Sequence, residues 1–296
     1  MRSVTDKNIS MDRLLTDRLD DVAYNLNRDW DCVYLISGDG MTRIGKSILA
    51  QQICYYVSQK MGTPFTMKNI VFSGDELIER GHKLPKNSVI LYDEARGDLD
   101  NKRVIESNTK KILDFFSECG MYNHFFVLNM PDFFDYPKSI AILRSEALIN
   151  VYRKEVPKTD KAGKTIINWQ RGQYEFFTRK RKKKLYLMGK KTLDYGIHVG
   201  TPIYGQFNNK WILDYDKYAK IKLEYITRDR QRKTSTDERV QVRIYKQMVT
   251  DGMTIGKTQE QISKLLCISR RTLVNYNKTL GLDKHSIKVN PLDIEQ

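Results

Sequence analysis

Short apolar segments alternate with helical patterns through the first half of the chain. Residues 30–38 (WDCVYLISG) are mostly apolar, which is typical of a strand buried on both faces of a parallel sheet. Residues 47–60 (SILAQQICYYVSQK) place Ile48, Leu49 and Ile53 at helical spacing, and they predict a helix soon after that strand. A strand, a turn and a helix in this order are typical of an α/β sheet.

Two more apolar segments predict parallel strands of the same sheet. Residues 89–92 are followed directly by Asp93 and Glu94, and residues 124–129 (HFFVLN) end in Asn129. In sheets of this class, functional groups collect at the carboxyl ends of the strands. We therefore predict an α/β core with a parallel sheet and helices on both faces, and we expect these three polar residues to lie at one edge of it.

The pattern changes from about Lys154 onward. Aromatic residues interleave with charged ones, and residues 173–178 and 184–188 have the aromatic and charged composition of exposed strands rather than helix signals. Residues 179–184 are six consecutive cations, which we place at the tip or edge of a hairpin. Residues 227–238 contain no apolar residue and predict a linker.

The C-terminal part predicts a small helical module. Residues 239–249 can form one helix. Thr258 is a good N-cap for a short helix over residues 259–266, and Ser269 is a good N-cap for a second helix that begins at Arg270. A tight turn would connect the last two helices.

Charge divides the chain into two unequal parts. The whole chain carries 51 basic and 36 acidic side chains, a formal net charge of +15. Residues 1–150 carry 19 basic and 21 acidic side chains, whereas residues 151–296 carry 32 basic and 15 acidic ones. A nearly neutral half joined to a basic half predicts a polyanion-binding part. Nucleic acid is the favoured partner, and an anionic membrane or a solvated lysine-rich surface is the alternative.

Other features of the composition argue against several classes of protein. The four cysteines and four histidines are scattered, without the short spacings of a zinc site. No apolar run approaches the roughly 20 residues that span a bilayer. Residues 1–12 lack the apolar segment of a secretory signal. We expect a cytoplasmic protein, or one in the host cytoplasm if it is viral, with no membrane insertion.

The strongest motif follows the first predicted strand and satisfies GxxxxGK[ST] at every fixed position. Its glycines permit backbone angles that turn N–H groups towards a phosphate, and the next helix presents its positive end to the same anion. Lys46 would reach the β- and γ-phosphates, and the Ser47 hydroxyl would ligate Mg²⁺. The alternative is a glycine-rich turn without function. The predicted ATP-binding residues are Gly40, Met41, Thr42, Arg43, Ile44, Gly45, Lys46 and Ser47.

The polar strand ends supply the other candidate catalytic groups. Asp93 would hold Mg²⁺, usually through its water shell, and Glu94 would orient and deprotonate the attacking water. Asn129 could bridge the γ-phosphate and that water, or it could be a turn residue before Pro131. The alternative for the two acids is a core strand that ends in solvated carboxylates.

The set of GMTRIGKS, VILYDE and a later strand ending in Asn129 resembles the additional-strand catalytic-glutamate division of P-loop NTPases. Within that division it looks most like FtsK–HerA-type and zonula-occludens-toxin-like phage ATPases. The resemblance implies a RecA-like parallel sheet, ATP and Mg²⁺ as cofactors, and a homo-oligomer, often a ring. It also implies an arginine that completes the neighbouring subunit's site. Arg144 suits that role best, ahead of Arg103 and Arg96; the alternative for Arg144 is an ion pair with Glu146 or another acid.

Residues 256–282 resemble the helix-turn-helix of resolvase- and sigma-type DNA-binding domains. The apolar residues that such a motif buries are Ile262, Leu265, Ile268, Leu273 and Tyr276. The residues that the second helix would present to the major groove are Arg270, Arg271, Asn275 and Lys278. Cys267 stands where glycine is usual, so it must accept a positive φ or shift the turn. The alternative is a helical hairpin that docks a protein.

The six-cation run predicts a second contact with DNA. Six adjacent cations repel one another unless a polyanion neutralises them, and such contacts bind phosphates without reading sequence. The alternatives are an edge strand protected against aggregation and a nuclear-targeting segment. The residues of this predicted contact are Arg179, Lys180, Arg181, Lys182, Lys183 and Lys184.

Together these predictions give a domain organisation and two candidate functions. The predicted parts are a P-loop ATPase core (1–155), a basic β-rich extension (156–226), a linker (227–238), a helix-turn-helix module (239–285) and a tail (286–296). The favoured function is a Mg²⁺-dependent ATPase that acts on DNA as a motor or remodeller, in packaging, segregation or transfer of phage, plasmid or mobile-element DNA. The alternative is an ATP-gated DNA-binding regulator or replication initiator without translocation. A small-molecule kinase is disfavoured, because nothing resembles an acceptor-binding lid.

Overall fold

A computed structural model describes residues 2–4, 8–100, 107–159, 165–251, 253 and 257–280; at 2–4, 107, 228–241 and 279 it describes the backbone alone. The chain divides into two compact units, Met1–Ala219 and Lys220–Gln296, which we describe separately. Among the described residues, no helix combines the length and the apolar character needed to span a bilayer.

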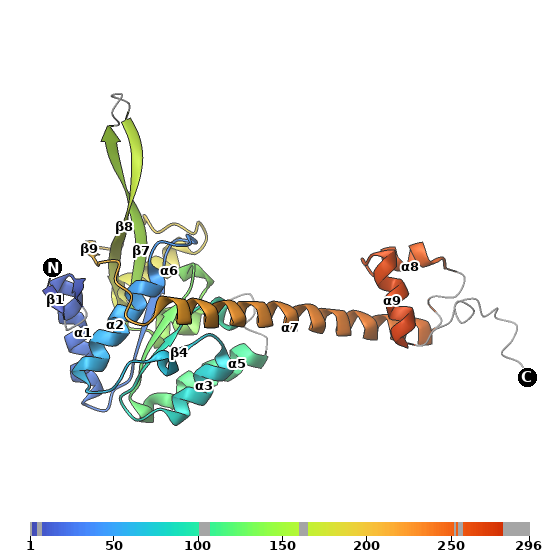
Figure 1. The fold of residues 1–296 in the computed structure, drawn as a ribbon, viewed down its shortest axis with the longest axis horizontal. Coiled ribbons are helices and arrows are strands. Elements are labelled where there is room, and N and C mark those ends of the chain that lie inside the picture. The colour runs from blue at the N-terminus through green and yellow to red at the C-terminus, as the bar shows by residue number, and fades with distance from the viewer. Residues whose placement is uncertain are drawn as a thin grey trace, which may run out of the picture. The chain divides into compact units, whose positions relative to one another are not determined.

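A seven-stranded mixed sheet forms the centre of the larger unit (Figure 1). The strands, in their spatial order, are β4 (Ile70–Val71), β5 (Val89–Tyr92), β6 (Phe125–Asn129), β3 (Cys32–Ser37), β7 (Ala147–Thr159), β8 (Thr165–Thr178) and β9 (Ile203–Gln206). The five strands from β4 to β7 are parallel, and β8 and β9 add antiparallel at one side. The predicted α/β class is confirmed.

The order of the strands is not their order in the chain. β6 lies between β3 and β5, with Cys32 and Val89 both opposite Phe125. Each of these strands is buried along its whole length, as expected for near-continuous apolar segments in a parallel sheet. As a result, the carboxyl ends of β3, β5 and β6 lie side by side.

Helices cover both faces of this sheet. On one face, alternate strand residues such as Val33 and Leu35 form a single core with α3 (Gly74–Lys83), α5 (Ser107–Glu118) and α6 (Arg179–Gly189). On the other face, α2 (Lys46–Lys60) packs against β3, β5 and β6, and α1 (Arg13–Leu26) packs on α2.

Shorter elements complete the larger unit. β1 (Arg2–Val4) and β2 (Ile9–Met11) form a two-stranded antiparallel sheet. Two short helical segments flank the sheet, α4 (Arg96–Leu99) and the π-helical η5 (Ser139–Arg144). The 3₁₀ turns are η1 (Met67–Asn69), η3 (Cys119–Tyr122) and η4 (Phe133–Asp135).

The predicted extension over 156–226 is not a separate part. β7 and β8 form a long hairpin whose inner half belongs to the main sheet, and β9 pairs with residues 173–176. The outer half of the hairpin projects beyond the other strands (Figure 1) and is largely solvent-exposed. The predicted strand over 173–178 is therefore confirmed, whereas the boundary near residue 155 falls inside β7.

The predicted strand over 184–188 is wrong, because this segment belongs to α6. The buried positions of α6 recur at helical spacing, but two of them are Arg181 and Lys182, so the apolar pattern alone did not reveal the helix. Arginine, lysine and leucine are also good helix formers. The six cations therefore begin a helix and do not form the tip of a hairpin.

The smaller unit consists of most of α7 (Tyr215–Thr250), α8 (Gln259–Leu265) and α9 (Arg270–Leu280). α7 is continuous through the predicted linker, so residues 227–238 are helical backbone and not an irregular connection. Tyr245 of α7, Ile262 of α8 and Leu273 of α9 form a small apolar core with their neighbours. The predicted tail over 286–296 lies outside the described residues.

The connection between α8 and α9 follows the sequence prediction in most details. Thr258 and Gln261 form a reciprocal capping pair at the start of α8, and the Ser269 hydroxyl accepts a hydrogen bond from the Thr272 amide. Cys267 has φ of 53°, the left-handed conformation that glycine would adopt more easily. Leu265, predicted to be buried, is 57% exposed, which corrects that prediction.

Candidate functional site

The loop between β3 and α2 has the backbone angles of a turn that only a few residue types tolerate. Gly40 and Gly45 have φ of 68° and 105°, and Arg43 between them has φ of 57°. A Cβ at Gly38 would lie 2.2 Å from Ile44 Cδ1, so the loop also folds too closely over this glycine for a side chain. The backbone angles therefore favour glycine at positions 40 and 45 of the motif, and close packing favours it at position 38 just before the motif.

Several amides of this loop have no backbone carbonyl as hydrogen-bond acceptor among the described residues. The amides of Gly38 and Gly40 donate to the Pro131 carbonyl, at 3.1 and 3.0 Å, and anchor the start of the loop. Within the described residues, none of the four amides of residues 42–45 donates a hydrogen bond to another backbone carbonyl. Amides arranged in this way ahead of a helix N-terminus fit the oxygens of a phosphate.

Lys46 is the first residue of α2, and its ammonium group turns back over the loop. Its Nζ donates a hydrogen bond to the Met41 carbonyl. The side chain is half-buried. The positive charge of this ammonium group adds to the positive end of α2. With little movement, the group can donate its hydrogen bond to a phosphate oxygen instead of to the Met41 carbonyl.

Three polar side chains meet next to this loop: Ser47 from the first turn of α2, Asp93 from the end of β5 and Asn129 from the end of β6. The Ser47 hydroxyl lies 3.3 and 3.2 Å from the two carboxylate oxygens of Asp93. The Asn129 amide nitrogen donates to the same carboxylate and lies 3.3 Å from the Ser47 hydroxyl. Asp93 and Asn129 therefore lie together at one edge of the sheet, as the sequence predicted for these two residues.

These residues also fit a hydrated magnesium ion. A serine hydroxyl and a carboxylate offer the oxygen ligands that Mg²⁺ prefers, and Asn129 Oδ1 is buried without a hydrogen-bond partner among the described residues. Among those residues, no three His, Cys, Asp or Glu side chains cluster in a way that could hold a metal by themselves. Such a site would depend on phosphate and water for its remaining ligands, which is the usual arrangement for Mg²⁺ bound with a nucleotide.

Glu94 lies directly after Asp93 and has an unusual backbone. Its φ is 62°, which a non-glycine residue adopts only at some energetic cost, about 1–3 kcal/mol. The next amide, that of Ala95, donates to the Asn129 carbonyl at 3.1 Å and fixes this turn against β6. The side chain is half-buried. Strained residues of this kind concentrate at functional sites.

A group of carboxylates lies on the other side of the loop. Burial, with the nearby charges of Asp132 and Asp194, raises the pKa of Asp39 above its usual value. Tyr195 donates a hydrogen bond to Asp132 at 2.9 Å and accepts one from the Phe133 amide at 2.7 Å. The loop therefore carries a carboxyl group, Asp39, whose ionised form is disfavoured by its surroundings.

Arg144 does not lie at this edge of the sheet. Its guanidinium forms an ion pair with Asp31, which precedes β3 and so lies at the amino end of the parallel strands. Its Nε donates to the Phe116 carbonyl at 2.8 Å. These contacts match the alternative considered for Arg144, an ion pair with an acidic residue.

The two other arginines considered for that role give no replacement. Arg96 lies 3.3 Å from Asp135 and 3.7 Å from Asp100. Arg103 lies outside the described residues. An arginine that acts between subunits is not identified here.

The segment after β9 contacts the site, and the sequence analysis missed it. Tyr218, in the first turn of α7, donates a hydrogen bond to Asp93 Oδ2. Phe207 packs against the loop, since a Cβ at Gly45 would lie 3.2 Å from its ring. No motif marks these residues. The only available signal was the pair of buried amides Gln51 and Gln52 on the otherwise apolar face of α2, which bind this segment.

The six cations of α6 do not form one DNA-binding surface. Lys182 is fully buried and its Nζ donates to the Ala141 carbonyl at 2.6 Å. Arg181 is 9% exposed and binds Glu175 and the Phe176 carbonyl. Arg179 is exposed and pairs with Glu146. The prediction of a DNA contact is therefore wrong for Arg181 and Lys182; the remaining exposed lysines are Lys180, Lys183 and Lys184.

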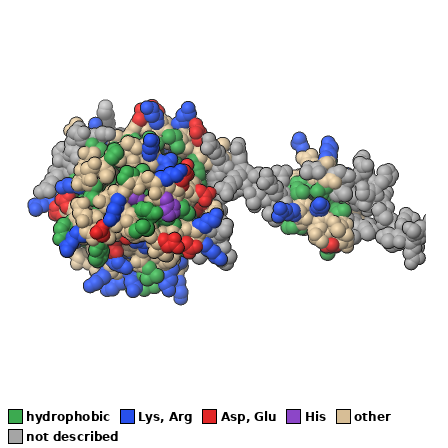
Figure 2. All heavy atoms as spheres, turned by 90° about the horizontal axis from the view of Figure 1, so that it is seen from below, with side chains coloured by type: hydrophobic (Ala, Val, Ile, Leu, Met, Phe, Trp, Pro, Cys, Tyr) green, Lys and Arg blue, Asp and Glu red, His purple; other side chains and the backbone are tan. Residues whose placement is uncertain are grey.

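The four residues predicted to face DNA from α9 are all exposed. They are Arg270, Arg271, Asn275 and Lys278. In the view of Figure 2, cations stand on the visible face of the smaller unit, whereas on the larger unit they are interspersed with acidic side chains. Of the two predicted DNA contacts, the one on α9 keeps all its residues accessible.

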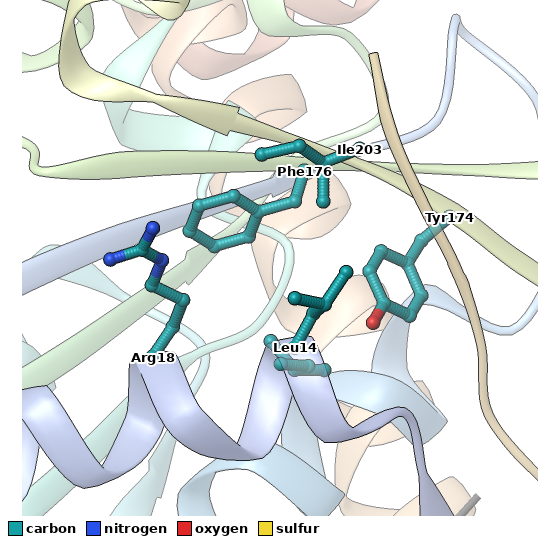
Figure 3. Close-up of a pocket in the computed structure, with 6 residues that line it drawn as sticks. Leu14, Arg18, Tyr174, Phe176 and Ile203 are labelled. Atoms are coloured by element: carbon teal, nitrogen blue, oxygen red, sulfur yellow. The ribbon is translucent and has the colours of Figure 1, made fainter. Parts of the chain in front are cut away.

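A small cavity on the α1 face of the larger unit is not a second candidate site. Leu14, Leu15 and Arg18 of α1 face Tyr174 and Phe176 of β8 across it, with Ile203 of β9 at its edge (Figure 3). Its volume of about 80 Å³ is far below the roughly 300 Å³ at which ligand pockets begin. Its walls are almost entirely apolar, so we regard it as a packing gap.

Comparison with known protein families, with curated proteins and with solved structures gave no match in any of the three. The geometry of this chain is therefore the basis for its proposed function.

Proposed function

We propose that this protein is a Mg²⁺-dependent ATPase with a RecA-like core, and that it acts on DNA. The observation that carries the proposal is the meeting of Ser47, Asp93 and Asn129 beside a phosphate-binding loop. The strand order gives further support. β6 lies between β3, which leads into the loop before Ser47, and β5, which leads to Asp93. An additional strand at this place defines the additional-strand catalytic-glutamate division of P-loop NTPases, which the motifs resemble.

In the proposed reaction each residue has one task. The amides of the loop and Lys46 hold the triphosphate, and Ser47 and Asp93 hold the metal, which when bound neutralises charge on the β- and γ-phosphates. Glu94 accepts the proton of the attacking water, and Asn129 orients that water against the γ-phosphate. The buried carboxyl ends of β5 and β6 keep bulk water away from Asp93.

DNA is the proposed polyanion because of the smaller unit. Its last two helices have the capped ends and left-handed turn of a helix-turn-helix, and α9 exposes Arg270, Arg271 and Lys278. We favour a motor or remodeller of phage, plasmid or mobile-element DNA that works as a homo-oligomer. An ATP-gated, site-specific regulator is the second candidate, favoured by the same exposed helix.

Two substitutions test the ATPase. Lys46→Ala should abolish nucleotide binding, because the loop loses its cation. Glu94→Gln should still bind ATP but hydrolyse it at least about 100-fold more slowly, since it cannot accept a proton. Steady-state phosphate release and nucleotide titration measure the two effects. Glu79→Gln, on the exposed side of α3, is the matched control and should behave as the unaltered chain. Full hydrolysis by Glu94→Gln would contradict the catalytic assignment.

The second candidate is separated from the first by its dependence on DNA. Hydrolysis that rises many-fold with any long duplex supports a motor. Hydrolysis that responds to one short sequence alone supports a regulator.

A further inference from the structure

The carboxylate of Asp93 is enclosed by hydrogen-bond donors. Its side chain has no exposed surface, and Ser47, Asn129 and Tyr218 all donate to it. Asn129 and Tyr218 are each only 3% exposed. A carboxylate has room for about four hydrogen bonds, so little of Asp93 is left for the water shell of a metal.

Of these three donors, Tyr218 comes from the element that is least built into the sheet. Asn129 is the last residue of the central strand β6 and Ser47 lies at the start of α2, whereas Tyr218 lies in the first turn of α7. Its ring packs against Trp211 and Phe72, with centroids 5.1 and 6.0 Å away. Displacing Tyr218 would leave the sheet unchanged, whereas displacing either of the others would disturb a strand end.

The chain that leads to Tyr218 is attached to α2 by polar contacts. Gln52 Nε2 donates to the carbonyls of Asn208 and Lys210, at 2.8 Å each. The Leu213 amide donates to Gln51 Oε1 at 3.4 Å. α2 is also the helix that begins with Lys46 and Ser47. The segment that leads into the first turn of α7 is therefore attached to the proposed nucleotide-binding helix.

We propose that Tyr218 is a positioning residue that links the metal position to the first turn of α7. Its hydroxyl donates a hydrogen bond to Asp93 before Mg²⁺–nucleotide binds, and this hydrogen bond is lost when the complex binds. This inference rests on the proposed function, because it requires a metal–nucleotide complex at Ser47 and Asp93. It adds that binding at this site changes the attachment of the helix that continues into the smaller unit.

Linkage gives the expected effect of removing the hydroxyl. A contact that is present before binding and lost upon it weakens binding, so Tyr218→Phe should bind a non-hydrolysable ATP analogue more tightly in the presence of Mg²⁺, by roughly tenfold for one hydrogen bond to a charged group. The same titration in EDTA should be unchanged. A residue that only supported the fold would alter both titrations in the same direction.

Two further measurements sharpen this test. Tyr215→Phe, one turn earlier on α7 and also beside Trp211, is the matched control and should bind as the unaltered chain does. A chain carrying Trp30→Phe and Trp169→Phe keeps Trp211 as its one tryptophan. Mg²⁺ and the analogue should change Trp211 emission in that chain, and the change should shrink when Tyr218→Phe is added.

The outcomes are distinct. Selective tightening with Mg²⁺ supports the inference. Unchanged or weaker binding with Mg²⁺, or equal shifts with and without it, would overturn the inference while leaving the ATPase proposal intact. Failure of the unaltered chain to bind the analogue would overturn both. Thermal unfolding of Tyr218→Phe is measured in parallel, so that a folding defect is recognised as the cause of any weaker binding.

Discussion

Ser47 and Asp93 lie 46 residues apart in the chain, yet the fold brings the hydroxyl to 3.2 Å from the carboxylate. This proximity follows from topology. Parallel strands present their carboxyl ends at the same edge, so a residue just after β5 must lie near one that follows β3 by a short loop. The chemistry of the site depends on this single geometric consequence.

Asp39 gives a prediction at the scale of one residue. It lies in the loop between β3 and α2, and burial together with Asp132 and Asp194 raises its pKa, so a negative charge is already disfavoured there. Asp39→Asn should therefore bind a triphosphate more tightly, by about threefold, if the ionised group repels phosphate by somewhat under 1 kcal/mol. Nucleotide titration measures this effect. Asp17→Asn on exposed α1 is the control, and equal behaviour of the two variants would contradict the prediction.

At this scale the sequence was informative where a motif has fixed spacing. The loop glycines, Lys46, Ser47 and Asp93 were predictable, because their chemistry requires particular residue types next to one strand. Tyr218 was not, since it reaches Asp93 from 125 residues further along the chain and through a connection with no regular pattern. The ion pair of Arg144 with Asp31 was not predictable for a related reason: the two residues are 113 positions apart, and a charged pair leaves no periodic signal.

The helix α6 shows how an element can be missed when its buried face is charged. The sequence predicted the cations at the tip or edge of a hairpin, in contact with DNA, and a strand over residues 184–188. Arg181 instead lies over the Phe177 ring at 4.6 Å, and Lys182 is enclosed with the Ala141 carbonyl as its partner. Long basic side chains can line an apolar surface when their ends find acceptors. The strands β3, β5 and β6 had no such ambiguity, because short continuous apolar segments bounded by polar residues are typical of buried strands.

Lys182 makes the stability of the larger unit depend on pH. Burial, with the charge of Arg179, lowers the pKa of Lys182 to about 8 from its ordinary value of 10.5. Between pH 8 and 10.5 the unfolded chain binds more protons than the folded chain at this position. The free energy of unfolding should therefore rise with pH through that window, by up to about 3 kcal/mol.

Denaturant unfolding at a series of pH values between 7.5 and 10 checks this prediction. At each pH, the free energy of unfolding of the unaltered chain is compared with that of Lys182→Met. This variant removes the titrating group and leaves the other groups in place. As pH rises, the free energy of unfolding of the unaltered chain should increase relative to that of Lys182→Met. A difference that stays constant would show that Lys182 keeps its ordinary pKa.

At the scale of the whole molecule, the two units divide the proposed tasks between them. All the residues proposed for ATP hydrolysis lie before Ala219, and the exposed basic residues of α9 lie after it. The sequence predicted the two tasks but misplaced the boundary, because polar residues 227–238 are compatible with both a solvated helix and a linker. The helix α7 spans the boundary instead.

This division predicts separable effects. The double variant Arg270→Ala, Arg271→Ala should weaken binding to duplex DNA, and the slope of log affinity against log salt should become smaller by about two. Basal ATP hydrolysis should be unchanged. Lys264→Ala on α8, an exposed lysine paired with Glu260, is the control. Unaltered DNA affinity and salt slope in the double variant would rule out α9 as a DNA-contacting helix.

The projecting half of the β7–β8 hairpin has a consequence for the behaviour of the protein in solution. Two strands that pair only with each other leave both outer edges open, and open edges recruit strands from other molecules. This hairpin carries Pro157, which has no amide hydrogen to offer, and the exposed lysines Lys154 and Lys158 on the same strand. Proline and lysine at an edge discourage pairing with strands of other molecules, so the β7 edge of the arm is a poor template for such pairing.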